Sequence, residues 1–250
     1  MYLDIHAHLD LCGDVESMMK RARDVLVVTN GLGTESNRKC LDIAGKYGNV
    51  LVALGLYPSE LLKMDGGDIS REIEFISENK DRIIGIGEVG LDFSYEGHSK
   101  QTAVFKKMID LSFDLDVPLI VHSRKAEKDV LNILEKKGAK KVVLHCFNGN
   151  FKLVSKIVDN GWMLSIPLII FRSKHFQGIA ENVPVNNILT ETDSPYLGRD
   201  GENEPANVKL IVEKIAFIKK MNKKIVEKRI FSNFERFFGK KFVFDSESEK

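Results

Sequence analysis

The amino-acid sequence predicts an α/β fold, a TIM (β/α)8 barrel with extra C-terminal helices. Three observations lead to this expectation. The chain has 250 residues, short apolar runs recur along its whole length, and segments with helical apolar spacing separate these runs. That length fits eight strand–helix units. No linker, low-complexity segment or block of charge divides the chain, so we expect a single domain over residues 1–250.

Eight runs rich in β-branched residues are the expected strands. Parallel strands that helices cover on both faces read as near-continuous apolar runs. The eight runs are 2–6, 25–29, 50–54, 83–87, 118–122, 141–146, 163–166 and 188–192. A doubly wound sheet also alternates strands with helices, but usually has fewer strands. The number of runs therefore favours the barrel.

Helical spacing appears between and after these runs. Residues 102–115 and 126–134 have the apolar periodicity of amphipathic helices. After the eighth run, residues 206–221 and 224–238 predict two closing helices. We expect the polar end of the chain, about 240–250, to be frayed.

The composition is that of a globular protein without a bulk charge. Lys and Arg number 37 and Asp and Glu 36, a net charge of +1, so no overall attraction for nucleic acid or a membrane surface is expected. The apolar runs are far shorter than the ~20 residues that span a bilayer, and the first residues do not resemble a secretory signal. Three cysteines without CxxC spacing argue against a disulfide framework. We therefore expect a cytoplasmic protein with no membrane partner.

Candidate metal ligands gather where the predicted strands end, which is where barrel enzymes carry their catalytic groups. His6 and His8 end the first run, and side chains two residues apart on a strand point to the same side. Four further runs end in, or are followed by, one ligand-type side chain each: Glu88, His122, His145 and Asp193. Glycines on both sides of Glu88 permit close backbone approach. The other histidines, His98 and His175, fall in or near predicted helices and are expected at the surface or in packing.

Four imidazoles and two carboxylates predict a centre of two divalent metal ions. This donor set suits Zn, Mn, Co or Ni better than Mg, although such sites often accept several metals. Six ligands are too many for one open catalytic ion. Two ions that share a carboxylate fit better, and the water between them would ionise to a bridging hydroxide, the expected nucleophile.

At these residues the sequence resembles the TatD family of metal-dependent hydrolases, within the amidohydrolase superfamily. The resemblance runs from the first predicted strand to the last helix. The matching motifs are Asp4–Asp10 (DIHAHLD), Ile86–Asp92 (IGEVGLD), His122–Arg124, His145–Phe147, Glu191–Leu197 (ETDSPYL), Asn203–Val208 and Ser232–Phe238.

The resemblance implies a role for each ligand. One metal would be held by His6, His8, Glu88 and Asp193, and a second by Glu88, His122 and His145. Asp193 would also be the catalytic residue, which accepts a proton from water and returns it to the leaving group. The implied activity is that of a deoxyribonuclease, an enzyme of EC class 3.1, with no nucleotide cofactor.

Two segments depart from the family pattern, and both concern the substrate. Tyr57 precedes Pro58 where the family usually has His before Pro, and the loop 197–203 is shorter and less basic than is typical. Tyr57 can still form a hydrogen bond to a phosphate oxygen, and the guanidinium groups of Arg124 and Arg199 match phosphate geometry. These three residues are the expected substrate-binding residues.

Three functions remain open from the sequence. The first is hydrolysis of DNA, with single strands or ends as the expected substrates because a near-neutral chain does not grip a long duplex. The second applies the same hydroxide to the carbonyl of an amide, ester, lactone or aminoacyl ester. The third is a non-catalytic barrel with structural metals, which the intact Asp193 disfavours. No residue pattern indicates an oligomeric state.

Overall fold

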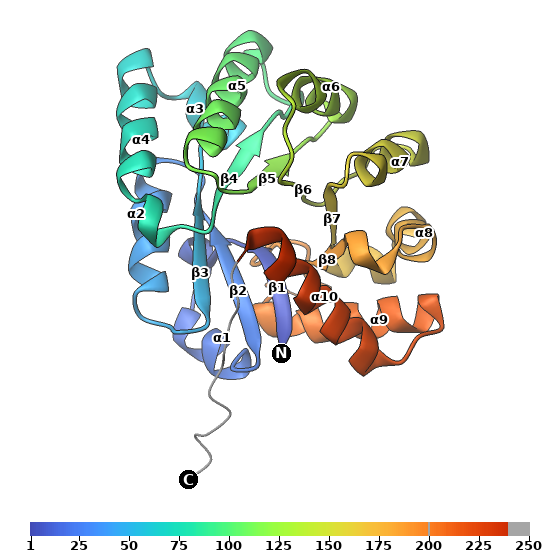
Figure 1. Cartoon of the computed structure of the whole chain (residues 1–250). Helices are drawn as coiled ribbons and strands as arrows, with labels where there is room; N and C mark the ends of the chain where they lie inside the picture. The colour runs from blue at the N-terminus through green and yellow to red at the C-terminus, as the bar shows by residue number, and fades with distance from the viewer. Residues whose placement is uncertain (200, 240–250) are drawn as a thin grey trace.

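The computed structural model describes residues 1–199 and 201–239. Eight parallel strands form one sheet, in which each strand pairs with the next along the chain. This sheet and the helices around it confirm the predicted TIM barrel (Figure 1). The strands are β1 (Tyr2–Ala7), β2 (Val25–Asn30), β3 (Val50–Leu54), β4 (Gly85–Gly90), β5 (Leu119–His122), β6 (Val142–Leu144), β7 (Met163–Ile166) and β8 (Ile188–Thr190).

The last strand returns to the first, so the barrel is nearly closed. The hydroxyl of Thr190 on β8 donates to the main-chain oxygen of Leu3 on β1 at 2.6 Å. Just beyond β8, the main-chain nitrogen of Asp193 donates to the main-chain oxygen of His6 at 2.8 Å. The two ends of the sheet therefore meet where the candidate ligands lie.

Ten α-helices surround the sheet within the described part of the chain. They are α1 (Val15–Arg21), α2 (Thr34–Ala44), α3 (Pro58–Leu62), α4 (Gly66–Glu78), α5 (His98–Asp114), α6 (Glu127–Lys137), α7 (Phe151–Asp159), α8 (Lys174–Asn182), α9 (Val208–Lys219) and α10 (Lys223–Phe238). Short 3-10 turns occur at Leu9–Leu11, Lys80–Arg82, Leu168–Phe171, Val185–Asn187 and Pro205–Asn207. Among the described residues, no helix combines the length and the apolar character that a membrane crossing requires.

Side chains at several helix starts accept hydrogen bonds from the first turn. Asp14 caps α1 and Asp65 caps α4, while Asn150, Ser173 and Asn222 do the same for α7, α8 and α10. Such caps satisfy main-chain N–H groups that have no partner inside the helix. The helix starts are thus determined by local sequence as well as by packing on the sheet.

The two closing helices follow the prediction closely. The segment predicted as 206–221 begins with a 3-10 turn and continues as α9, and α10 begins one residue before the predicted 224. The amide of Asn233 on α10 donates to the main-chain oxygens of Val185 and Ile188 at 2.7 and 3.0 Å, so α10 packs at the amino end of β8 (Figure 1). The predicted frayed tail, 240–250, lies outside the described residues.

Three strands end two or three residues away from the predicted position. The predicted strand 83–87 continues through the glycines to Gly90, where an added Cβ would lie 2.0 Å from the main-chain oxygen of His122. The predicted strands 141–146 and 188–192 stop earlier, at Leu144 and Thr190. The backbone then adopts positive φ at Cys146 (42°) and Asp193 (58°), which a strand cannot accommodate.

Polar residues are buried mainly at one end of the barrel. The core consists of apolar strand side chains, such as Leu26, Val121 and Leu164, packed against helix side chains such as Phe105. At the carboxyl ends of the strands, by contrast, the buried residues include Asp4, His6, His8, Glu88, Asp92, His145, Glu191 and Thr192. Burying polar groups costs free energy unless they are paired, so this concentration marks the candidate site.

Candidate metal centre

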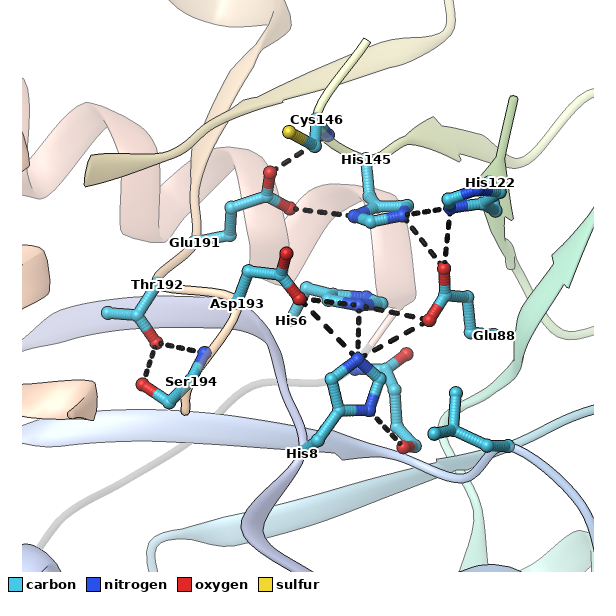
Figure 2. A network of polar contacts seen from close by, with 12 residues as sticks. His6, His8, Glu88, His122, His145, Cys146, Glu191, Thr192, Asp193 and Ser194 are labelled. Carbon is cyan, nitrogen blue, oxygen red and sulfur yellow. Dashed lines mark hydrogen bonds and ion pairs between the residues drawn. The ribbon is translucent and has the colours of Figure 1, made fainter. Parts of the chain in front are cut away.

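The six predicted ligands meet in one cluster at the carboxyl ends of the strands (Figure 2). The carboxylate of Glu88 lies in the middle of the cluster, with one oxygen facing each half. We call these halves the first ligand set (His6, His8, Asp193 and Glu88 Oε2) and the second ligand set (His122, His145 and Glu88 Oε1).

The first ligand set has spacings that suit a metal ion. The Nε2 atoms of His6 and His8 are 3.1 Å apart, and each lies 3.4 Å from Glu88 Oε2. Asp193 Oδ1 lies 3.6 and 3.5 Å from the same two nitrogens. A tetrahedral ion with bonds of 2.0–2.1 Å separates its ligand atoms by about 3.3–3.4 Å. Ligand atoms of His6, His8 and Asp193 all lie within 4.8 Å of one another, so these three fit around one ion, and Glu88 Oε2 lies beside the two imidazoles.

The second ligand set contains three donors. Glu88 Oε1 lies 2.8 Å from His122 Nδ1 and 2.9 Å from His145 Nε2, and these two nitrogens are 3.0 Å apart. Three protein donors leave a position open for water or substrate, as catalytic sites require. Ligand atoms of His6, Glu88 and His145 also lie within 4.8 Å of one another, so the two sets form one compact centre.

The donor atoms of the cluster are arranged for metal ions rather than for hydrogen bonds to one another alone. In both sets two imidazole nitrogens face each other across hydrogen-bonding distance, and at least one of each pair must offer a lone pair. Four imidazoles and two carboxylates suit borderline divalent metals, and the residues present therefore fit such ions.

The charges of the cluster keep its carboxylates ionised. Burial alone would raise the pKa of Glu88, but the charges of His145 and His6 and hydrogen bonds from His122 and His145 hold it well below its usual range. Burial likewise opposes ionisation of Asp193, yet its hydrogen bond with His8 and the neighbouring imidazoles lower its pKa. Hydrogen bonds from His8 to Asp193 and Glu88 overcome burial and raise the pKa of His8 to about 10. An incoming metal ion would therefore displace a proton from His8.

The first ligand set is supported by a main-chain oxygen and by the contact of Asp4 with Thr192. His8 Nδ1 pairs with the main-chain oxygen of Asn30 at 2.9 Å, which leaves Nε2 free to ligate. The carboxylate of Asp4 accepts hydrogen bonds from the main-chain nitrogen and the hydroxyl of Thr192 at 2.8 and 2.5 Å. This contact joins β1 to the segment that carries Asp193, so it fixes the two sides of the set relative to each other.

The second ligand set is supported by buried carboxylates. Asp92 Oδ2 lies 3.3 Å from His122 Nε2, and Glu191 Oε2 lies 3.6 Å from His145 Nδ1. Glu191 also accepts hydrogen bonds from Ser165 at 2.7 Å and from the main-chain nitrogen of Cys146 at 2.8 Å, and the Cys146 sulfur points away from the ligands (Figure 2). A carboxylate behind a histidine fixes its tautomer and makes it a stronger ligand.

Sequence reasoning did not assign roles to Asp4, Asp92 and Glu191. A signal was present for two of them, because Asp4 and Glu191 each stand two residues before a ligand and strand alternation places such pairs on one side. His98 and His175 lie outside the cluster, where His98 stacks on Phe93 and His175 pairs with the main-chain oxygen of Phe147.

The cluster opens into a cavity of about 760 Å³. Three tyrosines, Tyr57, Tyr95 and Tyr196, contribute to its wall, together with the basic residues Lys39 and Arg124. The acidic residues Asp10, Glu35 and Glu60 and the leucines Leu11, Leu32 and Leu197 line it as well. Two of the three predicted substrate-binding residues, Tyr57 and Arg124, therefore face the cavity.

Arg199, the third predicted substrate-binding residue, is placed elsewhere. Its guanidinium lies 5.0 Å from the ring centroid of Phe171, and it lines a separate hollow with Arg172 and Leu168. The structure thus does not bring Arg199 to the cavity wall beside the ligands.

Comparisons with known proteins identify the family of this chain. The family model described as TatD related DNase matches residues 3–239. An uncharacterized metal-dependent hydrolase of Methanocaldococcus jannaschii is 33% identical, over 96% of this chain and 98% of its own. The human deoxyribonuclease TATDN3 is 34% identical, over 87% of each chain. The crystal structure of the Escherichia coli TatD homolog YJJV superposes with a TM-score of 0.89 at 21% identity, over 96% of this chain and 98% of that one. The chain therefore belongs to the TatD family of metal-dependent hydrolases.

Proposed function

We propose that this hydrolase cleaves DNA phosphodiester bonds as a deoxyribonuclease, with two divalent ions (Zn, Mn, Co, Ni or Mg) held by the two ligand sets. The observation that carries the proposal is the position of Glu88, whose two oxygens face separate ligand sets beneath one cavity. Support also comes from the human relative, which is named a deoxyribonuclease.

The proposed reaction needs one water molecule and one proton carrier. Divalent ions at the two sets would polarise the phosphoryl oxygen and make water a stronger nucleophile. The water oxygen forms a bond to phosphorus as the bond from phosphorus to the leaving oxygen breaks. The carboxylate of Asp193, which is ionised and partly open to the cavity, accepts the proton of the water and passes it to the leaving oxygen.

The cavity wall supports a single strand or a strand end as the substrate. Tyr95 and Tyr196 are 43% and 52% exposed, and exposed aromatic rings offer stacking surfaces to unpaired bases. Arg124 lines the cavity and forms no ion pair with any residue of the described chain, so its guanidinium is available to a phosphate. Tyr57 lines the same cavity, but its hydroxyl donates to Asp92 and is not free to donate to a phosphate. The position of Arg199 over Phe171 likewise gives it no support as a substrate contact.

A second candidate function is hydrolysis of a small amide, ester, lactone or aminoacyl ester at the same centre. The specific observation in its favour is the acidic part of the wall, formed by Asp10, Glu35 and Glu60. These carboxylates repel a long polyanion but not a small uncharged substrate. The ligand sets themselves serve either reaction.

The proposal extends to the compartment in which the enzyme works. Cys12, Cys40 and Cys146 are free thiols, as is usual in a reducing compartment. A cytoplasmic location agrees with this.

The test is hydrolysis of end-labelled single-stranded DNA by protein that has been stripped with a chelator and refilled with one divalent metal at a time. Asp193→Asn serves as the control for contaminating nucleases. We expect metal-dependent cleavage that falls by about 10²- to 10⁴-fold in the variant, the usual contribution of a general acid–base group. No cleavage with any metal, or equal cleavage by Asp193→Asn, would contradict the proposal, and small esters and amides would then be assayed.

A further inference from the structure

Asp92 is the buried carboxylate that contacts His122 of the second ligand set. Its Oδ1 accepts hydrogen bonds from the main-chain nitrogen of Ser94 at 2.9 Å and from the Ser94 hydroxyl. Its Oδ2 faces His122 Nε2 at 3.3 Å and accepts a hydrogen bond from the hydroxyl of Tyr57 at 3.1 Å. Gln101 bonds to both the main-chain nitrogen and the main-chain oxygen of Asp92 at 2.9 and 3.0 Å. The carboxylate is therefore held in one orientation.

Tyr57 reaches Asp92 from a different part of the barrel. It stands at the start of α3, after β3, and its main-chain nitrogen donates to the oxygen of Leu32 at 2.9 Å. Its ring packs edge-on against the imidazole of His122, with 5.0 Å between the centroids. Its hydroxyl lies 3.1 Å from Asp92 Oδ2 and 3.5 Å from His122 Nε2. An ionised carboxylate only accepts hydrogen bonds, so the hydroxyl proton is directed at Asp92.

The contacts of Tyr57 and Asp92 determine which ring nitrogen of His122 carries the proton. With Nε2–H directed at Asp92, His122 keeps its lone pair on Nδ1, the atom that lies 2.8 Å from Glu88 Oε1. Tyr57 orients Asp92, and Asp92 orients the imidazole.

We propose that Tyr57 is a positioning residue, which acts through Asp92 to strengthen metal binding at the second ligand set and leaves the first set unaffected. The proposal rests on the proposed two-metal function. It assigns the tyrosine a role beyond contact with substrate, because its one hydrogen is already donated within the protein.

The test is a titration of chelator-stripped protein with Co²⁺ in the presence of a competing chelator. Visible absorption measures how much Co²⁺ the protein binds at each step. His122→Ala identifies which binding step belongs to the second set. We expect Tyr57→Phe to weaken that step by about three- to tenfold, the contribution of one hydrogen bond, and Asp92→Asn to weaken it by about 10- to 100-fold. The other step should not change.

The matched control is Tyr95→Phe, which also removes one hydroxyl from the cavity wall. The Tyr95 side chain makes no hydrogen bond within the described residues, so both cobalt affinities should equal those of the unmodified protein. Melting temperatures of all variants, measured without added metal, check that each folds.

A double variant separates action through Asp92 from independent action. If Tyr57 acts through Asp92, Tyr57→Phe should have no further effect in the Asp92→Asn background. If the fold-losses in cobalt affinity of the two single variants multiply in the double variant, Tyr57 does not act through Asp92. Unchanged cobalt affinities in Tyr57→Phe, or equal weakening of both binding steps, would also overturn the proposal. Unmodified protein that binds one cobalt ion in total would instead contradict the two-metal function itself, and this proposal with it.

Discussion

The two ligand sets share Glu88 but are supported in different ways. In the first set, His8 is oriented by the main-chain oxygen of Asn30, and the main-chain nitrogen of Asp193 bonds to the oxygen of His6. In the second set, the carboxylates of Asp92 and Glu191 stand behind the two histidines. Main-chain support follows from the fold of the barrel, whereas carboxylate support depends on individual side chains. The second set should therefore be the more sensitive to single substitutions around it.

The largest effect is expected where the two sets join. Glu88→Gln removes the only charge that both sets share, and Glu88 is buried with hydrogen bonds to both His122 and His145. Both cobalt affinities should fall by more than about 10- to 100-fold, the usual cost of changing an outer partner. Cobalt content after dialysis measures this. A variant that keeps one ion at full affinity would show that the sets do not depend on a common carboxylate.

A smaller and one-sided effect is expected at Glu191. Glu191→Gln keeps the shape of the side chain but weakens its support of His145, so the second cobalt affinity should fall by about 10- to 100-fold while the first is unchanged. The control is Glu72→Gln on α4, another buried carboxylate, which pairs with Asn37 and Arg38. It should alter neither affinity. If Glu191→Gln lowers the cobalt affinity of both ligand sets, the two sets are not supported independently.

The smallest effect concerns the link between β1 and the Asp193 segment. Thr192→Val removes the hydroxyl that bonds to buried Asp4, and the free energy of unfolding should fall by about 1–3 kcal/mol. Urea denaturation measures it. Thr190→Val, which removes a bond to the main-chain oxygen of Leu3, should cost only about 0.5–1.5 kcal/mol. Equal losses of unfolding free energy in the two variants would mean that the bond to Asp4 stabilises the protein no more than the bond from Thr190 to Leu3 does.

The fold could be predicted because its strands are continuous apolar runs. The clustering of the six candidate ligands could be predicted because they are polar residues at the ends of those runs. The exact ends were harder to predict. At Cys146 and Asp193 the chain leaves the strand through positive φ, a geometry that is uncommon at residues other than glycine and that the apolar pattern does not indicate. At Gly90 the strand continues because the neighbouring backbone lies too close for a side chain.

Partners across the barrel were not predictable from sequence spacing. Asp92 meets His122, and Glu191 meets His145, only because of the register between separate strands. The position of the long Arg199 side chain was not predictable either, because its guanidinium lies over Phe171 instead of in the cavity. Spacing along one strand predicts neighbours on that strand, whereas contacts between strands require the three-dimensional register.

The nearly closed barrel has a consequence for the growing chain on the ribosome. His6 and Asp193, which face each other at 3.6 Å, are separated by almost the whole length of the described sequence. A nascent chain that ends before β8 already contains both histidines of β1 but lacks the carboxylate opposite them. Contacts between such distant residues form late in folding. The first ligand set is thus complete only once the chain has passed β8, whereas every residue of the second set precedes that strand.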